Sequence, residues 1–171
     1  MKIWFFKVAC LLLVLSSCNS DSAFESEFEK SLDAWNVQKN REGNSYRYTA
    51  RVSSVFGFGS STTITVQNGE VVSREYEAFV FNPQTQEEEI TSTWTENKSE
   101  LNTHEEGAEP LTLDEIYGTC RRDILSVNQD DNFINFEAEN NGILSICTYF
   151  PKNCADDCSV GFFIVHFEWL N

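Results

Sequence analysis

The densest local group of chemically active side chains is Cys154-Ala155-Asp156-Asp157-Cys158, in which two cysteines flank two aspartates. Thiolates and carboxylates bind metal ions, and a pair of nearby thiols can carry out redox chemistry. Both uses favour the shorter Cys-x-x-Cys spacing, whereas an oxidising compartment turns such a pair into a disulfide. The segment is therefore interpreted as a disulfide-braced loop, with no metal and no other cofactor expected.

Histidine, the side chain most often used for proton transfer near neutral pH, occurs only at His104 and His166. A zinc site needs three or four ligands, and these two residues are widely separated and lack a supporting motif. The sequence also has no Gly-x-Ser-x-Gly motif that would place a serine for a Ser-His-Asp triad. These observations favour a protein that is not an enzyme, with no catalytic residue to assign.

Cys18 stands where a lipid-modified cysteine is expected. After Lys2, an apolar stretch interrupted only by Lys7 runs to Leu15 and is too short to span a bilayer. It ends in Leu15-Ser16-Ser17-Cys18. This run resembles the lipobox, which directs diacylation of the cysteine thiol and cleavage before that residue. The alternative is an ordinary signal peptide in which Cys18 plays no part.

The lipobox interpretation divides the chain into three parts. We expect a lipoprotein signal peptide over residues 1–17, a polar tether over 18–23, and one domain over 24–171. Lipid on Cys18 would hold that domain to a membrane of the bacterial cell envelope, since two or more acyl chains make anchoring stable. Asn19 after the cysteine favours the outer membrane.

After Cys18 the chain contains Cys120, Cys147, Cys154 and Cys158, an even number in a compartment that permits disulfides. Four cysteines allow three pairings. We favour Cys147 with Cys158, because the two flank the loop between them almost symmetrically, and this leaves Cys120 with Cys154. The competing pattern joins Cys120 to Cys147 and Cys154 to Cys158.

The chain is strongly acidic, with a formal net charge of −15. Removal of residues 1–17 takes away two lysines and no acidic residue, so the processed chain is more acidic still. A protein of this charge does not attract phosphate groups, so no nucleic-acid partner is expected. The acidic residues are spread along the chain, which indicates a solvated surface rather than a cation site.

Two segments have the period of a helix. Phe24, Phe28, Leu32 and Trp35 recur at steps of four, four and three, which predicts an amphipathic helix ending before Gly43. Thr112 and Glu115 stand at capping-box spacing at the start of the second segment. Its apolar stripe continues through about Leu125 and consists of Leu113, Ile116, Tyr117, Cys120 and Ile124.

Strands are predicted where the period changes to two. Asn68-Gly69 and Asn141-Gly142 tolerate the positive φ angles of type I′ turns and so predict hairpins. Residues 96–110 are polar and without periodicity, which predicts an exposed connection. In the last strand, alternation places four side chains on one face, namely Phe163, Val165, Phe167 and Trp169. The first predicted strand begins at Ser45. The others cover residues 62–66, 70–81, 89–95, 133–137, 143–150 and 160–169.

The order of these elements predicts an α+β fold. Because short turns rather than helical crossovers join successive strands, the sheet should be antiparallel. Each helix has one apolar face, so both helices should pack on one face of the sheet. The expected order is helix, strands, helix, strands.

Several landmarks resemble a family of uncharacterised bacterial secreted proteins and lipoproteins, a domain of unknown function. They follow in order along nearly all of the chain after Cys18: Trp35, Asn44–Tyr48, Ile64–Val72, Thr112–Tyr117, Ala155–Asp157 and Gly161–Phe162. The resemblance implies an exported protein. Since no activity is established for that family, it implies no catalytic residue.

Two functions from different classes fit the sequence. The first is a non-enzymatic module that presents the polar strand face of Arg47, Thr49 and Arg51 to an envelope protein partner. The alternative is a small-molecule-binding or hydrolytic domain with a pocket between sheet and helices. The Gly57-Phe58-Gly59 turn after Phe56 could form an exposed binding tip, although covering one end of the sheet is the favoured interpretation of its aromatics.

Overall fold

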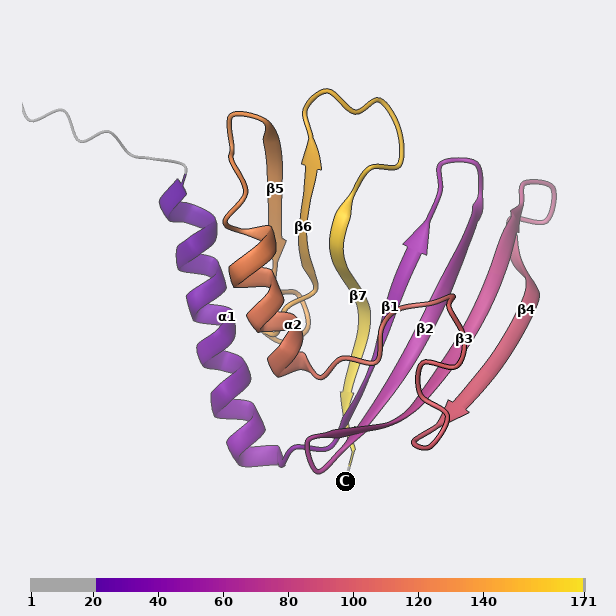
Figure 1. Cartoon of the computed structure of the whole chain (residues 1–171), viewed down its shortest axis with the longest axis horizontal. Helices are drawn as coiled ribbons and strands as arrows, with labels where there is room; N and C mark the ends of the chain where they lie inside the picture. Colours follow the sequence, from indigo (N-terminus) through magenta and orange to yellow (C-terminus); the bar gives the residue numbers. More distant parts are fainter. Residues whose placement is uncertain (1–20, 171) are drawn as a thin grey trace, which may run out of the picture.

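A computed structural model describes residues 21–170, which form a seven-stranded antiparallel sheet with helices on one side (Figure 1). The strand order across the sheet is β4-β3-β2-β1-β7-β6-β5. The expected α+β class is confirmed, and so is the order of helix, strands, helix, strands. The elements are α1 (Asp21–Glu42), β1 (Tyr46–Ser53), β2 (Phe58–Gln67), β3 (Glu70–Asn82), β4 (Glu87–Asn97), α2 (Leu113–Thr119), the π-helical turn η1 (Cys120–Ile124), β5 (Asn132–Glu137), β6 (Ile146–Pro151) and β7 (Val160–Trp169).

An aromatic core joins both helices to the same face of the sheet. Trp35 of α1 lies 5.1 Å from the Tyr46 ring and stacks on Trp169 with ring centroids 5.4 Å apart. Phe28 of α1 meets the Tyr117 ring of α2 at 5.8 Å. Rings of this size bury roughly 150–250 Å² each, so this cluster supplies much of the hydrophobic stabilisation.

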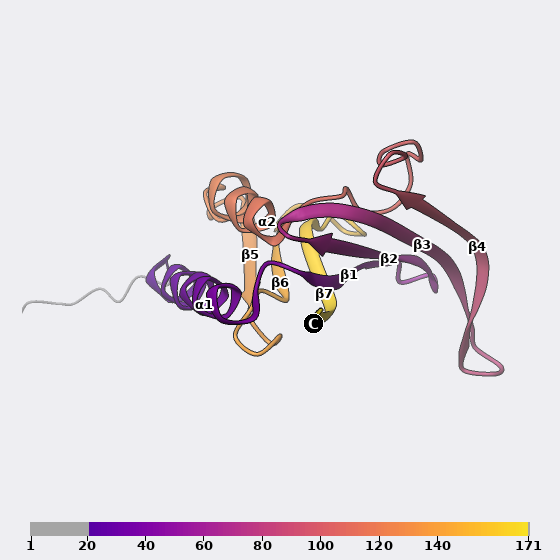
Figure 2. The same ribbon diagram turned by 90° about the horizontal axis from the view of Figure 1, so that it is seen from below.

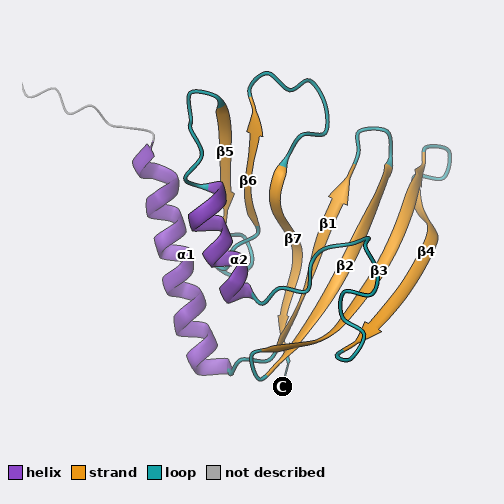
Figure 3. Cartoon of the chain, in the orientation of Figure 1, coloured by secondary structure: helices purple, strands orange, loops and turns teal. Residues whose placement is uncertain are grey.

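The helices lie on one half of the sheet, with α2 in front of β5 and β6 and α1 alongside β5, as Figure 3 shows. The loop that connects β4 to α2 crosses in front of the other half, over β1, β2 and β3. Seen along the sheet, β3 and β4 curve away from the helices (Figure 2). One face of this second half therefore lies under a loop rather than under a helix.

Both Asn-Gly turns adopt the predicted conformation. Asn68 and Gly69 have φ angles of 51° and 82° between β2 and β3, and Asn141 and Gly142 have 56° and 85° before β6. Positive φ at both central residues is the type I′ geometry that matches the twist of paired strands. The strand bounds differ in detail, since β4 extends two residues beyond each end of the predicted 89–95 and β6 starts at Ile146.

The predicted apolar face of the last strand is wrong, because β7 contains a bulge. Thr49 of β1 pairs with His166, whereas the next residue, Ala50, pairs with Ile164. Val165 is the extra residue of this bulge and is 57% exposed, while Ile164 is buried. An extra residue shifts the alternation, so the β7 side chains in the core are Phe162, Ile164, Phe167 and Trp169.

The pairing between β1 and β7 ends at this bulge. The half of β7 from Ile164 to Trp169 pairs with β1, whereas the half from Val160 to Phe163 pairs with β6. The pairing of β1 with β7 ends at Ala50, although β1 continues to Ser53. The sheet is therefore forked between the upper halves of β1 and β7.

The connection after β4 is not the fully exposed segment that its polarity predicted. Glu96 is completely buried, and Ala108 and Leu111 pack against the hydrophobic core. Glu96 accepts hydrogen bonds from the backbone N–H groups of Asn102 and His104 at 3.0 and 2.7 Å. A single buried carboxylate thus folds the connection back onto the sheet.

The disulfides follow the competing pattern rather than the favoured one. Cys120 is bonded to Cys147 with their Cα atoms 6.0 Å apart, and Cys154 is bonded to Cys158 with a Cα separation of 6.3 Å. The symmetry of the loop was a poor guide, because β6 buries Cys147 against η1, where Cys120 lies. The prediction that Cys120 points into the core is confirmed.

The signal peptide over 1–17 and the lipidated Cys18 lie outside the described residues. The predicted tether, 18–23, is shortened, since α1 already begins at Asp21. Among the described helices, none combines the length and the apolar character needed to cross a membrane.

Candidate functional site

A cleft of about 430 Å³ opens on the helix side of the sheet, at the fork between β1 and β7. Its floor is formed by alternate residues of β1, which are Tyr48, Ala50 and Val52. Phe162 and Ile164 of β7 continue the floor across the fork. Because β1 and β7 are no longer paired beyond Ala50, backbone hydrogen bonds do not join the two strands here, and the cleft opens between them.

One wall of the cleft is α2, which forms about two turns. Thr112 caps this helix, because its side chain accepts from the N–H of Glu115 while the Glu115 carboxylate accepts from the Thr112 N–H. The reciprocal cap fixes where α2 begins. It therefore fixes where Ile116 and Thr119 face the cleft.

The opposite wall is the connection from Gly107 to Leu111, which hydrogen bonds hold to the floor. The Ala108 N–H donates to the Thr62 hydroxyl at 3.0 Å, and the Tyr48 hydroxyl donates to the Leu111 carbonyl at 2.6 Å. Burial raises the pKa of Tyr48 well above its usual value, so its hydroxyl stays protonated as a donor. Gly107 has a φ of +85°, and a Cβ at this position would lie 2.9 Å from the Thr62 hydroxyl, which leaves no room for a side chain.

A buried ion pair stabilises this wall from behind. Arg74 of β3 donates from two nitrogens to the two carboxylate oxygens of Glu96 on β4, at 2.9 Å each. The same guanidinium donates to the Ala108 carbonyl at 3.1 Å. These hydrogen bonds from Arg74 hold the pKa of Glu96 far below its usual range, so the pair remains charged.

An aromatic stack covers the ion pair. His104 lies flat on Trp94 with ring centroids 4.4 Å apart, and Trp94 stacks on Tyr76 at 4.9 Å. The Arg74 guanidinium sits 4.6 Å from the centre of the Trp94 ring. His104, a candidate for chemistry from its residue type, thus has a role in closing the connection over Glu96.

The lining of the cleft is chemically quiet. Within the described residues, it contains no histidine and no cysteine, and its hydroxyl groups belong to Tyr48, Ser60, Thr62 and Thr119. Two of these hydroxyls already hydrogen bond to the wall. Apart from Arg51 and Glu109, apolar side chains predominate on the remaining surface, so the arrangement is suited to holding a mostly apolar ligand.

The predicted interaction surface lies on the opposite face of the sheet. Arg47 donates to Thr65 at 3.3 Å and forms an ion pair with Glu168 at 3.5 Å, while the Thr49 hydroxyl lies 3.0 Å from Thr63. Arg47, Thr49 and Arg51 share one face of β1, as alternation predicted. Their partners leave little unpaired positive charge on it.

Arg51, the third residue of this surface, is fully engaged. Its guanidinium forms an ion pair with Glu88 and lies 4.2 Å from the centre of the Phe79 ring. It also donates to Ser61 at 3.4 Å. Arg51 therefore ties β1 to β3 and β4 across the polar face.

The other sequence candidates lie apart from the cleft. His166 is exposed beside Thr49 on the polar face, and the Cys154–Cys158 loop precedes the N-terminal end of β7; neither contributes a residue to the lining of the cleft. The cleft residues Ala50, Thr62 and Ala108 were missed in the sequence. Their one signal was small size at positions where strand alternation calls for a core side chain.

The aromatic turn after β1 is exposed, which contradicts the favoured interpretation that it covers one end of the sheet. Phe56 and Phe58 are 73% and 55% exposed, and their rings stack on each other at 6.5 Å. Gly57 between them has a φ of +84°, and its carbonyl accepts from the Phe81 N–H. The turn thus presents its rings to solvent beside the end of β3.

The structure is an α+β domain with a mostly apolar cleft on one face of the sheet and a polar opposite face. Comparisons with protein-family models, with curated proteins and with solved structures found no match. The resemblance to the uncharacterised secreted family therefore stays a prediction.

Proposed function

We propose that this protein is a lipid-anchored binding module of the bacterial cell envelope, without catalytic activity. The observation that carries the proposal is the cleft at the β1–β7 fork, with its apolar lining and its fixed walls. Ligand sites of this volume range are concave, mostly apolar and formed before the ligand arrives. The cleft, rather than the polar strand face of Arg47, is the site to which we assign binding.

The ligand class follows from the lining. The floor residues Ala50, Val52 and Ile164 offer hydrocarbon surface, and the hydroxyls of Ser60 and Thr119 can orient a polar end. A small, mostly apolar molecule with one neutral polar group fits this surface. Arg51 and Glu109 are the two charged residues of the lining and have opposite signs, so a ligand without net charge is favoured.

A titration with the neutral dye N-phenyl-1-naphthylamine tests the cleft. We expect saturable enhancement of fluorescence with the wild-type chain and binding at least tenfold weaker for Ala50→Phe, because the new ring fills the floor. Ala78→Phe is the matched control, since Ala78 lies on the same sheet face two strands away and outside the cleft. Equal binding by all three chains would remove the cleft as the binding site.

Intact-mass spectrometry of the membrane-extracted protein tests the anchor. We expect a chain that starts at Cys18, carries two or three acyl chains, and loses no mass from the anchor on reduction. A chain without lipid would rule out the proposed attachment and leave the cleft proposal to be judged on its own titration.

A further inference from the structure

Exposed apolar side chains gather at one end of the sheet. In the antiparallel arrangement, this end holds the C-terminal ends of β1, β3 and β6 and the N-terminal ends of β2, β4, β5 and β7. Of the large hydrophobic side chains exposed in residues 21–170, all but Val37 and Val165 lie here. We call this group the apolar rim; its members are Val52, Val55, Phe56, Phe58, Val80, Phe81, Ile90, Phe133, Phe150 and Val160.

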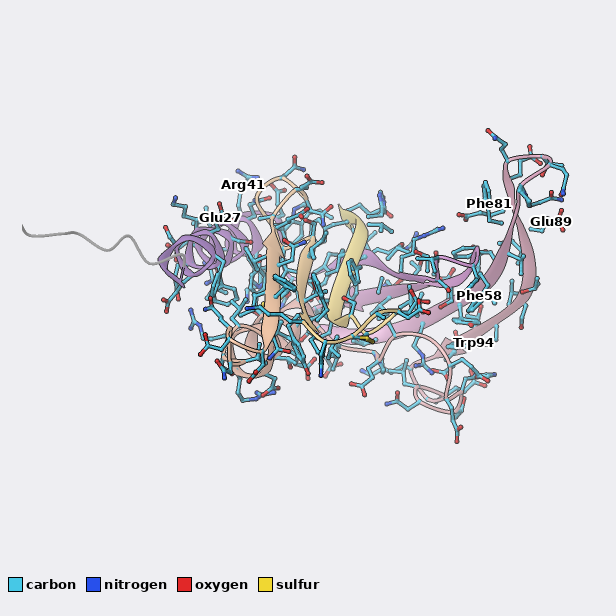
Figure 4. The ribbon with its side chains drawn as sticks, turned by 90° about the horizontal axis from the view of Figure 1, so that it is seen from above. Glu27, Arg41, Phe58, Phe81, Glu89 and Trp94 are labelled. Atoms are coloured by element: carbon cyan, nitrogen blue, oxygen red, sulfur yellow. A yellow bond between two sulfur atoms is a disulfide. The ribbon has the colours of Figure 1, made fainter. Side chains whose placement is uncertain are left out.

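The apolar rim extends across the whole width of the sheet. Figure 4 looks down on this end, with Phe58 and Phe81 pointing out from neighbouring hairpins. At the other side of the sheet, Phe133 and Phe150 pair with ring centroids 5.1 Å apart, and Lys152 lies over the Phe133 ring. A row of exposed aromatics on several strands is unfavourable in water, which points to a covering surface.

The helix α1 begins at this same end. Its C-terminus leads through a short turn into the start of β1 at the opposite end, so Asp21 lies on the side of the apolar rim (Figure 1). The sequence places three peptide units between Cys18 and Asp21. Three residues of extended chain span at most about 11 Å, so a lipid on Cys18 would hold this end of the domain close to the bilayer.

We propose that the apolar rim lies in the interfacial region of the membrane that carries the lipid anchor. This inference rests on the proposed lipidation of Cys18. Aromatic and aliphatic side chains are favoured at the membrane–water interface, and the short tether would hold the rim close to that interface. The rim thereby fixes the orientation of the domain, with the sheet standing on the bilayer.

The charges at this end identify the kind of membrane surface. Glu87, Glu88 and Glu89 lie in β4 beside the rim, and Asp156 and Asp157 lie in the loop before β7. Carboxylates are repelled by anionic headgroups, so the preferred surface is zwitterionic phospholipid. Lys152, over the Phe133 ring, is placed to approach headgroup phosphates.

Photo-crosslinking in native membranes tests the proposal. A benzoylphenylalanine at Phe56 reports on the rim, and one at Val37 is the matched control, because Val37 is 65% exposed on α1 and outside the rim. We expect phospholipid adducts at Phe56 with a yield at least tenfold higher than at Val37. Equal yields, adducts to a protein at Phe56, or no phospholipid adduct at Phe56 would each overturn the proposal.

The mass of Cys18 in the same sample separates the two claims. Acylated Cys18 without phospholipid adducts at Phe56 would remove the rim contact and keep the anchor. Unmodified Cys18 with phospholipid adducts at Phe56 would remove the anchor and keep the contact.

Discussion

Glu96 is a buried carboxylate whose solvation is replaced by the protein. Its two oxygens accept from Arg74, from the N–H groups of Asn102 and His104, and from the Thr103 hydroxyl at 3.1 Å. The many donors offset the desolvation of this buried charge. Removal of one member of the ion pair is strongly destabilising, because the other stays buried in an apolar interior without a counter-charge. The stability of the cleft wall should therefore depend on both members of the pair.

Loss of one partner is expected to destabilise the protein. Glu96→Gln should lower the free energy of unfolding by about 3 kcal/mol, because Arg74 stays buried without a counter-charge. Urea unfolding followed by circular dichroism measures the change. Lys98→Met is the control, since Lys98, directly after β4, forms an exposed pair with Glu70 of β3. A loss as large as that of Glu96→Gln would show that burial is not the cause.

The lowered pKa of Glu96 also predicts a pH dependence. Because the folded-state pKa lies below the unfolded value of about 4.3, the carboxylate contributes stability above that pH. The contribution is lost as pH falls from about 4.3 towards the folded-state pKa. Melting curves should therefore show the wild-type advantage over Glu96→Gln at pH 7, and a narrowing gap below pH 4; a constant gap at all pH values would contradict the assignment.

At the scale of elements, local pattern predicted much of what local chemistry controls. Both helices, the capping box at Thr112 and both Asn-Gly turns follow from residues within a few positions of one another. The bulge at Val165 leaves no such signal, because Ile164 and Val165 are both β-branched aliphatic residues and only the pairing with β1 decides which is buried.

The candidate site was harder to predict for a related reason. Its wall depends on Arg74 and Glu96, which are 22 positions apart and meet only after β3 and β4 pair. The surrounding polar residues make the connection resemble a solvated loop. The prediction of the disulfide pairing was wrong for the same reason, since the approach of η1 to β6 is a tertiary contact.

The helix cap at Thr112 connects an element to the cleft. Thr112→Ala removes the acceptor for the Glu115 N–H and should lower the free energy of unfolding by about 1 kcal/mol. Because α2 forms a wall, dye binding in the cleft should weaken more than for a stability-matched variant elsewhere. Thr112→Ser retains the hydroxyl and should preserve both properties; if it behaves like the alanine variant, the cap is not the cause.

The two disulfides should contribute unequally to stability. Cys120 and Cys147 close a separation of 27 residues, whereas Cys154 and Cys158 close one of 4. In the chain-entropy description, these loops correspond to about 3–4 and about 2 kcal/mol. Paired alanine replacements, compared by urea unfolding, measure the difference. A greater loss from Cys154→Ala with Cys158→Ala would reverse the expected order.

For the whole molecule, the sheet divides into two halves that are stabilised differently. The half under α1 and α2 has the aromatic core around Trp35. The other half ends in β4, whose residues Glu87–Thr93 are all exposed and whose pairing is with β3. The loop over this half is held by the buried Arg74–Glu96 ion pair and by hydrogen bonds to Thr62 and Tyr48.

This division predicts a gradient of local stability, which hydrogen exchange of backbone amides can measure. The amides of β4 should exchange through local opening, at least a hundredfold faster than those of Tyr46 and Tyr48 in β1, which require global unfolding. Arg74→Met should speed exchange further in β4 and in residues 98–111, because the loop loses the hydrogen bonds from Arg74 to the His104 and Ala108 carbonyls. It should leave the rank of protection in α1 unchanged, since the aromatic core is intact. Uniform protection across β1 and β4 would instead mean that the ion pair joins both halves into one cooperative unit, and that the cleft wall opens only when the whole domain unfolds.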